Sequence, residues 1–406
     1  MVDDYTLQVA DRLAAVLSQP NSSLESISRR MQGTPPELIV NLDPSLLSRF
    51  RPQGPPRCID GGSAQGFAVH PLDYAWTFTA ETSRALGERC ANGARCLWLG
   101  MPSVVRWLAE NRSTTTGVLV DRSPLVEHQT LLIERQTEQI RFEQRDLSGE
   151  PAQLSSQGFD RVFADPPWYP EHMHAWLSFA FAHCRVGTFV HLVVWPRLTR
   201  PGADRERVEL LTLLSRVGVV TTEEEVIEYR VPEFEQMRFR RVGLGELGSW
   251  RVADLWTVAV RSPGAWQAPP NGTALRRWRR YLIGQQQVAL RLREPDVVAS
   301  PSLAALPSGA TVASYSRRDS DRSEIELWLS NGYAFRVRGW SAFKDALDLM
   351  SGTSKRPSDR RTDEAMVALA SVGLDPCDHQ PYPWKVWEET EWSPGGNNAT
   401  NTNPTI

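Results

Sequence analysis

The chain has 406 residues, enough for two or three domains, and its 41% hydrophobic and 23% charged residues are ordinary for a globular protein. A formal net charge of −3 excludes a polycation that binds nucleic acid over its whole surface, although a local basic face stays possible. The five cysteines include no Cys-x-x-Cys pair, which argues against a structural zinc site or a disulfide framework and favours a reducing compartment. The N-terminus does not resemble a signal peptide, and no apolar run reaches membrane-spanning length. We therefore expect a cytoplasmic protein without a membrane or metal partner.

Residues 1–50 predict a helical module. Val9, Leu13 and Val16 form one apolar face, and Pro35-Pro36 can open a further helix because proline is tolerated in a first turn. The module could be helix-turn-helix-like or a cap on the next domain, and the cap is the simpler interpretation. Residues 51–69 are rich in proline and glycine and predict a loop or linker.

Residues 70–262 alternate between strand and helix patterns. Thr79 can cap a helix that runs from Ala80 to about Glu88. Strands are then predicted at 95–99, 117–120, 140–144, 161–164, 188–194, 219–220 with 226–229, and 254–260, with helices at 104–110, 124–138, 174–184 and 205–216. Such alternation implies an α/β fold with a parallel sheet that is covered on both faces.

Residues 273–392 predict a small α+β domain. Apolar residues from Leu275 to Leu292 fit an amphipathic helix, and a hairpin is centred on Asn331-Gly332 between alternating apolar residues. A helix follows from Trp340 to Met350, Thr362 can cap a last helix, and residues 393–406 are expected to be a disordered tail.

Two clusters of arginines could follow phosphates, but a solvated charged face is the more general expectation for such runs. They are Arg276, Arg277, Arg279 and Arg280 in one segment, and Arg238, Arg240 and Arg241 in another.

Asp165-Pro166-Pro167-Trp168 carries the most chemical information in the chain. The apolar run before it predicts a buried strand, and the two prolines end strand pairing because neither has an N–H to donate. The chain must then leave the sheet at its carboxyl edge, where ligands bind in open α/β folds. Asp165 and the carbonyl of Pro166 can accept N–H bonds from a neutral amine, and Trp168 can stack on a planar substrate. A proline-rich turn without chemistry would also explain the pattern.

These residues resemble the (Asp/Asn/Ser)-Pro-Pro-aromatic motif of S-adenosylmethionine-dependent amino-methyltransferases, and the order of strands over 70–262 resembles the class I methyltransferase sheet. The resemblance implies a seven-stranded Rossmann-like domain and S-adenosylmethionine (SAM) as the cofactor. It also implies an amine-bearing substrate, either adenine in nucleic acid or a protein side chain. The implied catalytic residues are Asp165, Pro166, Pro167 and Trp168, with Tyr169 and Tyr74 as weaker substrate-binding candidates.

The resemblance also implies a cofactor site. It places the methionine part of SAM at the loop after the first strand, which is Leu99, Gly100, Met101 and Pro102 here. Asp121, at the end of the second strand, would accept hydrogen bonds from the ribose hydroxyls, and Asp146 after the third strand would contact adenine. The loop has one glycine where the family usually has several. Asp121 could instead cap a helix, and Asp146 could start a turn.

Related families leave alternatives open. In messenger-RNA adenine methyltransferases the same tetrapeptide precedes the cofactor loop, whereas here it follows. The residues around it, 159–170, together with 71–74 and 79–86, resemble branched-chain polyamine synthases, which transfer an aminopropyl group from decarboxylated SAM. Their first loop is strongly acidic and the Gly100–Ser103 segment is not, so methyl transfer is the leading hypothesis. A third hypothesis is a catalytically inactive binding protein, which the glycine-poor loop favours and the presence of Asp165 and Trp168 opposes.

Overall fold

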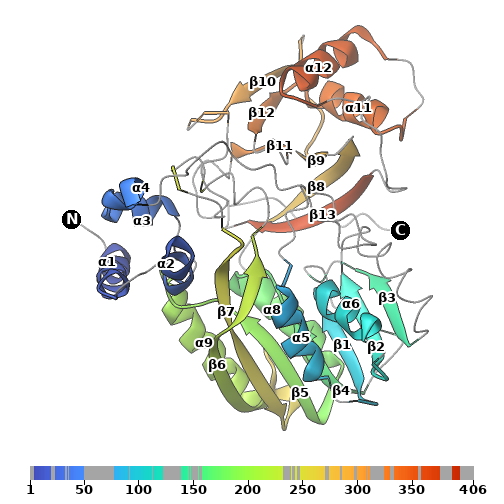
Figure 1. Ribbon diagram of the computed structural model, residues 1–406. Coiled ribbons are helices and arrows are strands. Elements are labelled where there is room, and N and C mark those ends of the chain that lie inside the picture. Colours follow the sequence, from blue (N-terminus) through green and yellow to red (C-terminus); the bar gives the residue numbers. More distant parts are fainter. Residues whose placement is uncertain are drawn as a thin grey trace. The chain divides into compact units, whose positions relative to one another are not determined.

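The structure is a computed structural model with two compact units, residues 1–268 and 269–406 (Figure 1). It describes residues 4–19, 23–32, 34, 36–49, 77–90, 92–111, 113–121, 139–145, 147, 154, 158–231, 239, 243–244, 247–269, 274–283, 286–296, 300–307, 309–310, 324–329, 333–354, 358–374 and 386–393. Several predictions lie outside these residues: the 51–69 linker, the 124–138 helix, the Asn331-Gly332 turn, the arginines at 238, 240 and 241, and the tail from 394 onward.

The first unit contains a seven-stranded sheet with the order β3-β2-β1-β4-β5-β7-β6. Strands β1 to β5 run parallel, and β7 is antiparallel to both of its neighbours. This arrangement agrees with the Rossmann-like methyltransferase sheet that the sequence predicts. The strands are β1 Arg95–Leu99, β2 Thr116–Asp121, β3 Ile140–Gln144, β4 Phe159–Ala164, β5 Cys184–Val194, β6 Gly218–Arg230 and β7 Ser249–Val260.

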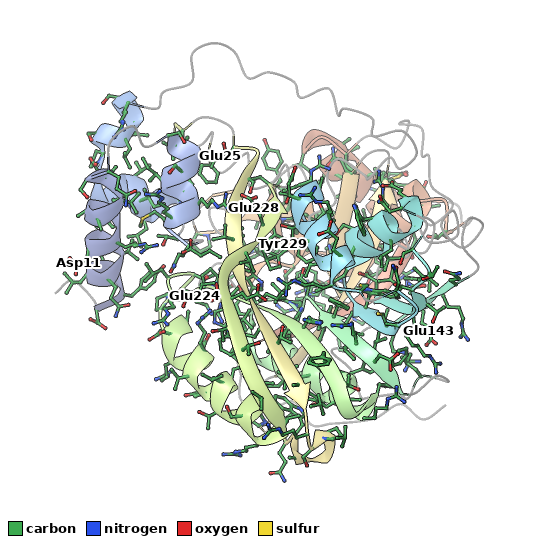
Figure 2. The ribbon with its side chains drawn as sticks, turned by 60° about the horizontal axis from the view of Figure 1, so that its bottom comes forward. Asp11, Glu25, Glu143, Glu224, Glu228 and Tyr229 are labelled. Carbon is green, nitrogen blue, oxygen red and sulfur yellow. The ribbon has the colours of Figure 1, made fainter. Side chains whose placement is uncertain are left out.

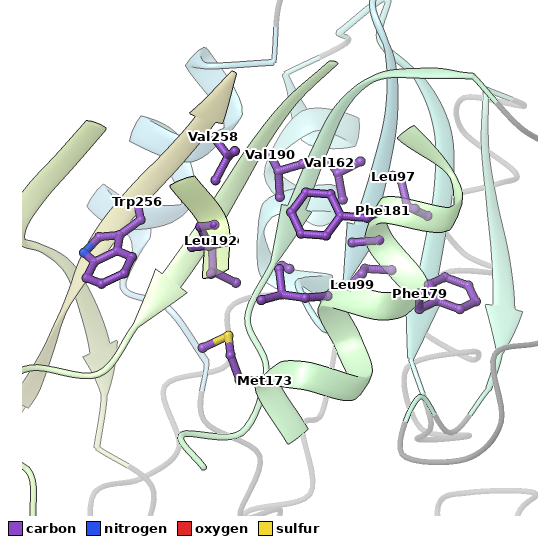
Figure 3. Close-up of a cluster of buried hydrophobic side chains, with 14 of the residues drawn as sticks. Leu97, Leu99, Val162, Met173, Phe179, Phe181, Val190, Leu192, Trp256 and Val258 are labelled. Carbon is purple, nitrogen blue, oxygen red and sulfur yellow. The ribbon is translucent and has the colours of Figure 1, made fainter. Parts of the chain in front are cut away.

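Helices cover both faces of this sheet because its central strands are apolar on both sides. Along β1, Leu97 and Leu99 enter one hydrophobic cluster, while Cys96 and Trp98 enter the cluster on the opposite face. Helices α8 Pro170–Ala182 and α9 Ala203–Val217 pack on the first face, part of which Figure 3 shows. Helices α5 Ala80–Glu88 and α6 Pro102–Glu110 pack on the second. Thr79 caps α5 as predicted, since its side chain accepts from the N–H of Thr82.

Helix α8 begins at Pro170, four residues before the predicted start at His174. Proline can occupy the first helical position because its missing N–H is not needed there. The helix ends at Ala182, and Cys184 opens β5 rather than ending the helix. The strand-to-helix connection at the end of β4 is therefore only five residues long, from Asp165 to Tyr169.

The N-terminal segment forms α1 Asp4–Leu17, α2 Leu24–Arg30, α3 Pro36–Leu42 and α4 Ser45–Arg49. Val9, Leu13 and Val16 are buried in its own small core, and α3 begins at the second proline as predicted. The module also binds the sheet domain: the Tyr5 hydroxyl donates to the carbonyl of Leu198, and Arg29 pairs with Glu228 at 3.1 Å. These contacts are those of a cap on the α/β domain.

The described residues of the second unit form an antiparallel sheet with the order β10-β12-β11-β9-β8-β13 and two helices. Leu327 pairs with Phe335, which confirms the hairpin pairing predicted around 325–337. The elements are β8 Ala274–Ile283, β9 Gln286–Arg291, β10 Ser302–Ala305, β11 Leu327–Leu329, β12 Ala334–Arg338, α11 Trp340–Met350, α12 Arg360–Ser371 and β13 Val386–Ser393.

Three predictions for this unit are wrong. The segment 275–292 forms the strand pair β8 and β9 instead of an amphipathic helix. The apolar residues of this segment fit both the helical period of 3.6 residues and the strand period of two. In the structure every second residue is buried, as in a strand: Tyr281 and Ile283 in β8, and Val288 and Leu290 in β9. The cap of α12 is Asp359, whose carboxylate accepts from the N–H of Thr362, and Thr362 is not the cap. The tail was predicted to begin at residue 393, but Ser393 is the last residue of strand β13.

Candidate active site at the carboxyl edge of the seven-stranded sheet

Three of the predicted site residues follow strand positions that are in register. Leu99 pairs with Val120 on one side and with Ala164 on the other, so Gly100, Asp121 and Asp165 come next on three adjacent strands. Backbone hydrogen bonds extend these ladders by one step: Asp165 N donates to the carbonyl of Leu99 at 3.1 Å, and Gly100 N donates to the carbonyl of Val120 at 2.9 Å. The fold therefore brings the first loop, Asp121 and the Asp165–Trp168 motif to one edge.

Gly100 has a backbone conformation and surroundings that require glycine. Its φ is +67°, which side chains of L-residues disfavour. A Cβ there would lie 2.6 Å from the ring of Trp176 and 3.3 Å from the carbonyl oxygen of Asp165. Trp176 comes from α8, and its buried Nε1 has no hydrogen-bond partner among the described residues. The single glycine of the loop thus lets the benzo edge of the Trp176 indole approach the loop backbone.

The Asp165 carboxyl group is held by a tyrosine. Tyr229, fully buried on β6, donates its hydroxyl hydrogen to Oδ1 of Asp165 at 2.5 Å. The pKa of Asp165 is raised to about 7, because burial and the charge of Asp121 raise it by more than the hydrogen bond from Tyr229 lowers it. Burial and the Asp165 charge raise the pKa of Tyr229 well above its usual value, so the phenol stays protonated and remains a donor.

Trp168 has a defined environment on two sides. Its ring meets the Tyr229 ring edge to face, with centroids 5.7 Å apart, and the guanidinium carbon of Arg251 lies 5.4 Å from the Trp168 ring centroid. A planar substrate that stacks on Trp168 must use a face that Arg251 does not cover.

Irregular pairing between β6 and β7 brings Tyr229 and Arg251 to this edge. Glu228 pairs with Val252 and Arg230 pairs with Ser249, so Tyr229 alone stands opposite two residues of β7, one of which is Arg251. Such β-bulges redirect side chains and are frequent beside functional sites. Figure 2 shows Glu228 and Tyr229 as neighbours on β6, and it is Glu228 that pairs with Arg29 of α2. Two consecutive residues of β6 therefore have different partners: Glu228 binds the helical module, and Tyr229 binds Asp165.

The remaining cofactor candidates differ in what they can offer. Leu99 and Met101 are fully buried in the two hydrophobic clusters, so only their backbones can face a ligand. Pro102 is the first residue of α6, with Met101 at the N-cap position. Asp121 ends β2, as the sequence predicts, and is partly buried, while Asp146 lies outside the described residues.

The substrate candidates near the motif are only partly brought to it. Tyr169 follows Trp168, and its ring lies under Arg200, whose guanidinium carbon is 5.2 Å from the ring centroid. His174 lies against Trp266, with centroids 6.1 Å apart, and burial lowers the pKa of His174 to about 4. Tyr74 lies outside the described residues.

Sequence reasoning missed three residues of this site: Tyr229, Arg251 and Trp176. Tyr229 and Arg251 lie far from the motif in sequence, and nothing in their strands distinguishes them from ordinary strand residues. Trp176 lies within helix α8, six residues after Pro170, and a tryptophan inside a helix is usually expected to pack in the core. Only the register of β6 with β7 and the approach of α8 to Gly100 reveal their positions.

Comparisons with known proteins identify likenesses of fold. No protein-family model matches the chain, and no curated protein matches it. The chain is similar to a branched-chain polyamine synthase from Thermus thermophilus in complex with N4-aminopropylspermidine and 5'-methylthioadenosine, with 16% identity over 64% of this chain and 94% of that one and a TM-score of 0.47. It is also similar to a putative RNA methyltransferase from Pyrococcus horikoshii, with 14% identity over 53% and 96% of the two chains and a TM-score of 0.34.

A third likeness is to fibrillarin from Aeropyrum pernix with natively bound S-adenosyl-L-methionine, with 17% identity over 41% of this chain and 67% of that one and a TM-score of 0.30. At such values the chain's own residues must carry any assignment of function. In the described part of the chain, no cluster of three or more His, Cys, Asp or Glu side chains could hold a metal ion, and no helix has the length and hydropathy needed to span a membrane.

Proposed function

We propose that this protein transfers a methyl group from SAM to an amino nitrogen. One observation carries the proposal: the Asp165 carboxyl group, held by Tyr229 through Oδ1, stands beside Gly100 and Asp121 at one sheet edge. This juxtaposition combines an acceptor for amine N–H groups with residues suited to a nucleoside cofactor.

The protein's part in the reaction is to bind and orient the amine. Oδ2 of Asp165 and the carbonyl of Pro166 can each accept an N–H bond, whereas the carbonyl of Pro167 already accepts from the N–H of Tyr169 at 2.7 Å. Two N–H bonds direct the nitrogen lone pair away from the motif, toward the first loop. The proton that an alkylated nitrogen must release can pass to the ionised Asp165 carboxylate, whose pKa of about 7 suits that role near neutral pH.

The residues present fit a SAM site. The Asp121 carboxylate can accept two ribose hydroxyl bonds, and Gly100 leaves the backbone of the first loop without a side chain next to it. When bound, SAM supplies a methyl carbon that its sulfonium already activates. The amine-bearing partner is a base in nucleic acid or a protein side chain.

Titration calorimetry tests this proposal. SAM, S-adenosylhomocysteine and decarboxylated SAM are titrated into the full chain and into Asp121→Ala. Binding of SAM or S-adenosylhomocysteine to the wild type, lost in Asp121→Ala, supports the proposal and leads to methyl-transfer assays on adenine- and lysine-containing substrates. Absence of binding by all three ligands contradicts it and favours an inactive binding protein with this fold.

A second candidate is aminopropyl transfer from decarboxylated SAM to a polyamine. The observation that favours it is the electrostatic interaction between Asp121 and Asp165, which raises the pKa of Asp165. A donor that ends in an ammonium group balances a second carboxylate better than a zwitterionic donor does, and an aliphatic ammonium acceptor needs a base before it can attack. Preferential binding of decarboxylated SAM in the same titration, followed by aminopropylation of spermidine, would select this candidate.

A further inference from the structure

Tyr229 contacts both ends of the Asp165–Trp168 motif. Its hydroxyl donates to Oδ1 of Asp165 at 2.5 Å, and its ring meets the Trp168 ring edge to face, with centroids 5.7 Å apart. One phenol therefore sets the orientation of the carboxylate and of the ring that flank the two prolines.

The structure holds Tyr229 rigidly. Its side chain is 2% exposed, and its ring packs on Phe78 with centroids 5.0 Å apart. Phe78 bridges to Tyr229 through the backbone, and Arg230 N donates to the carbonyl of Thr77 at 2.8 Å, so the segment before α5 fixes this part of β6. A phenol needed only for packing would not require its hydroxyl to lie within hydrogen-bonding distance of a carboxylate.

We propose that Tyr229 is a positioning residue of the amine site: it occupies Oδ1 of Asp165 so that Oδ2 and the Pro166 carbonyl face the substrate nitrogen. This proposal rests on the proposed function for its role in turnover, but the contact itself exists without substrate. It assigns to β6, the strand at the sheet edge, a direct part in the geometry of the motif that follows β4.

The hydrogen bond from Tyr229 should have a measurable effect on the pKa of Asp165. The groups that act on the Asp165 carboxyl are Tyr229 and Asp121, and the charge of Arg251 acts in turn on Tyr229. The hydroxyl bond stabilises the ionised carboxylate, so its loss must raise the pKa of Asp165 above about 7. A tyrosine that served only to fill space would leave that pKa unchanged.

The test is the titration of the Asp165 carboxyl carbon by NMR of the full chain labelled with carbon-13 at aspartate carboxyls, with Asp165→Asn to assign the signal. Tyr229→Phe retains the ring and removes the hydroxyl. We expect the Asp165 midpoint to move to higher pH by about one unit, the usual size of a single hydrogen-bond effect on a carboxylate. In an active enzyme, kcat should fall about 10- to 100-fold and its acidic limb should move to higher pH, with little change in the KM for SAM.

Two further variants complete the design. Tyr5→Phe removes a hydroxyl bond of similar length, to the carbonyl of Leu198, and should shift neither the midpoint nor kcat. Trp168→Phe, at a partly exposed position, leaves the hydrogen bond from Tyr229 to Asp165 in place and should shift the Asp165 midpoint much less than Tyr229→Phe does. An unchanged Asp165 midpoint in folded Tyr229→Phe, or an equal shift in both variants, would overturn the proposal. If the midpoints shift as expected but the wild type transfers no methyl group, the proposed function fails and the contact remains.

Discussion

Charged residues of the second unit and of the Asp165 edge of the seven-stranded sheet have different kinds of partner. In the second unit, charges are paired within the fold: Arg279 and Lys344 both bind Asp348, and Arg293 binds Glu326 and Asp296. At the carboxyl edge of the seven-stranded sheet, Asp165 is bound by a phenol, and its nearby charge is another carboxylate. In the second unit, opposite charges neutralise each other. At the carboxyl edge, the raised pKa of Asp165 allows its carboxyl group to gain or lose a proton near neutral pH.

Arg279 of β8 illustrates the difference. In a helix it was a candidate for phosphate binding, but in β8 its guanidinium group binds Asp348 of α11 at 3.2 Å. Arg279 is thus used within the second unit.

The strongest test of this contrast is Asp165→Asn. The amide still has an acceptor oxygen but cannot take a proton from the amine nitrogen, so we expect a loss of about 10³-fold in the rate of methyl transfer. SAM affinity should change less than threefold, because the proposed cofactor contacts are made by other residues. Single-turnover transfer and calorimetry measure the two effects. A variant with more than a tenth of wild-type transfer would show that Asp165 is part of a structural turn only.

The same variant should change how stability depends on pH. The folded Asp165 has a pKa of about 7, above the value of about 3.9 for an unfolded aspartate, so the folded state binds the proton more tightly. Stability contributed by this group is therefore full below about pH 4 and falls as pH rises through about 7, by about 1.4 kcal/mol per unit of difference. Asp165→Asn should be more stable than the wild type at pH 8 and no more stable at pH 4. Urea unfolding at both values measures this, and equal differences at the two pH values would contradict the raised pKa.

Gly100→Ala tests the loop on the neighbouring strand. The new Cβ would sit at φ +67° and 2.6 Å from the Trp176 ring, so strain and overpacking together should cost about 2–4 kcal/mol of stability and displace Trp176. We expect SAM binding to weaken at least tenfold. Gly93→Ala is the matched control, since Gly93 has φ +78° but no heavy atom within 4 Å of its Cβ position. It should cost about 1 kcal/mol and leave SAM binding intact. Equal effects of the two substitutions would show that backbone strain alone matters.

Asp121→Asn distinguishes the role of the Asp121 carboxylate from that of Asp165. Loss of hydrogen bonds to a charged group costs about 1.5–3 kcal/mol, so SAM affinity should fall about 10- to 100-fold. The charge of Asp121 raises the pKa of Asp165, so its removal should lower that pKa and shift the acidic limb of the pH–rate profile to lower pH. This shift is opposite in sign to that expected for Tyr229→Phe. A shift in the same direction would contradict the assigned charge interaction.

Much of the first unit could be predicted from sequence because its parallel strands are apolar on both faces and are separated by helices. The predicted ranges for β1 and β3 match, and Asp165 follows β4 as expected, since two prolines must end the pairing. The partners of Asp165 could not be predicted. Tyr229 reaches it through the register of an edge strand with a bulge, which depends on pairing between residues that are distant in sequence. In the second unit, the residues 275–292 fit two periods, and only the burial of alternate residues decided between them.

The smallest expected effect lies in the second unit. Arg279 binds Asp348 at 3.2 Å, and Lys344 binds the same carboxylate at 2.7 Å, so Arg279→Gln leaves one cation in place and should cost about 1 kcal/mol of stability. Arg360→Gln, which disrupts an exposed pair with Glu364, should cost less than about 0.5 kcal/mol. Neither substitution should change binding of a single-stranded oligonucleotide at 50 or 200 mM salt, because Arg279 is used in the fold. Thermal unfolding and fluorescence anisotropy measure the two quantities. A fall in oligonucleotide affinity with Arg279→Gln alone, together with a weaker salt dependence, would instead make β8 a phosphate-binding strand and give the second sheet a functional surface of its own.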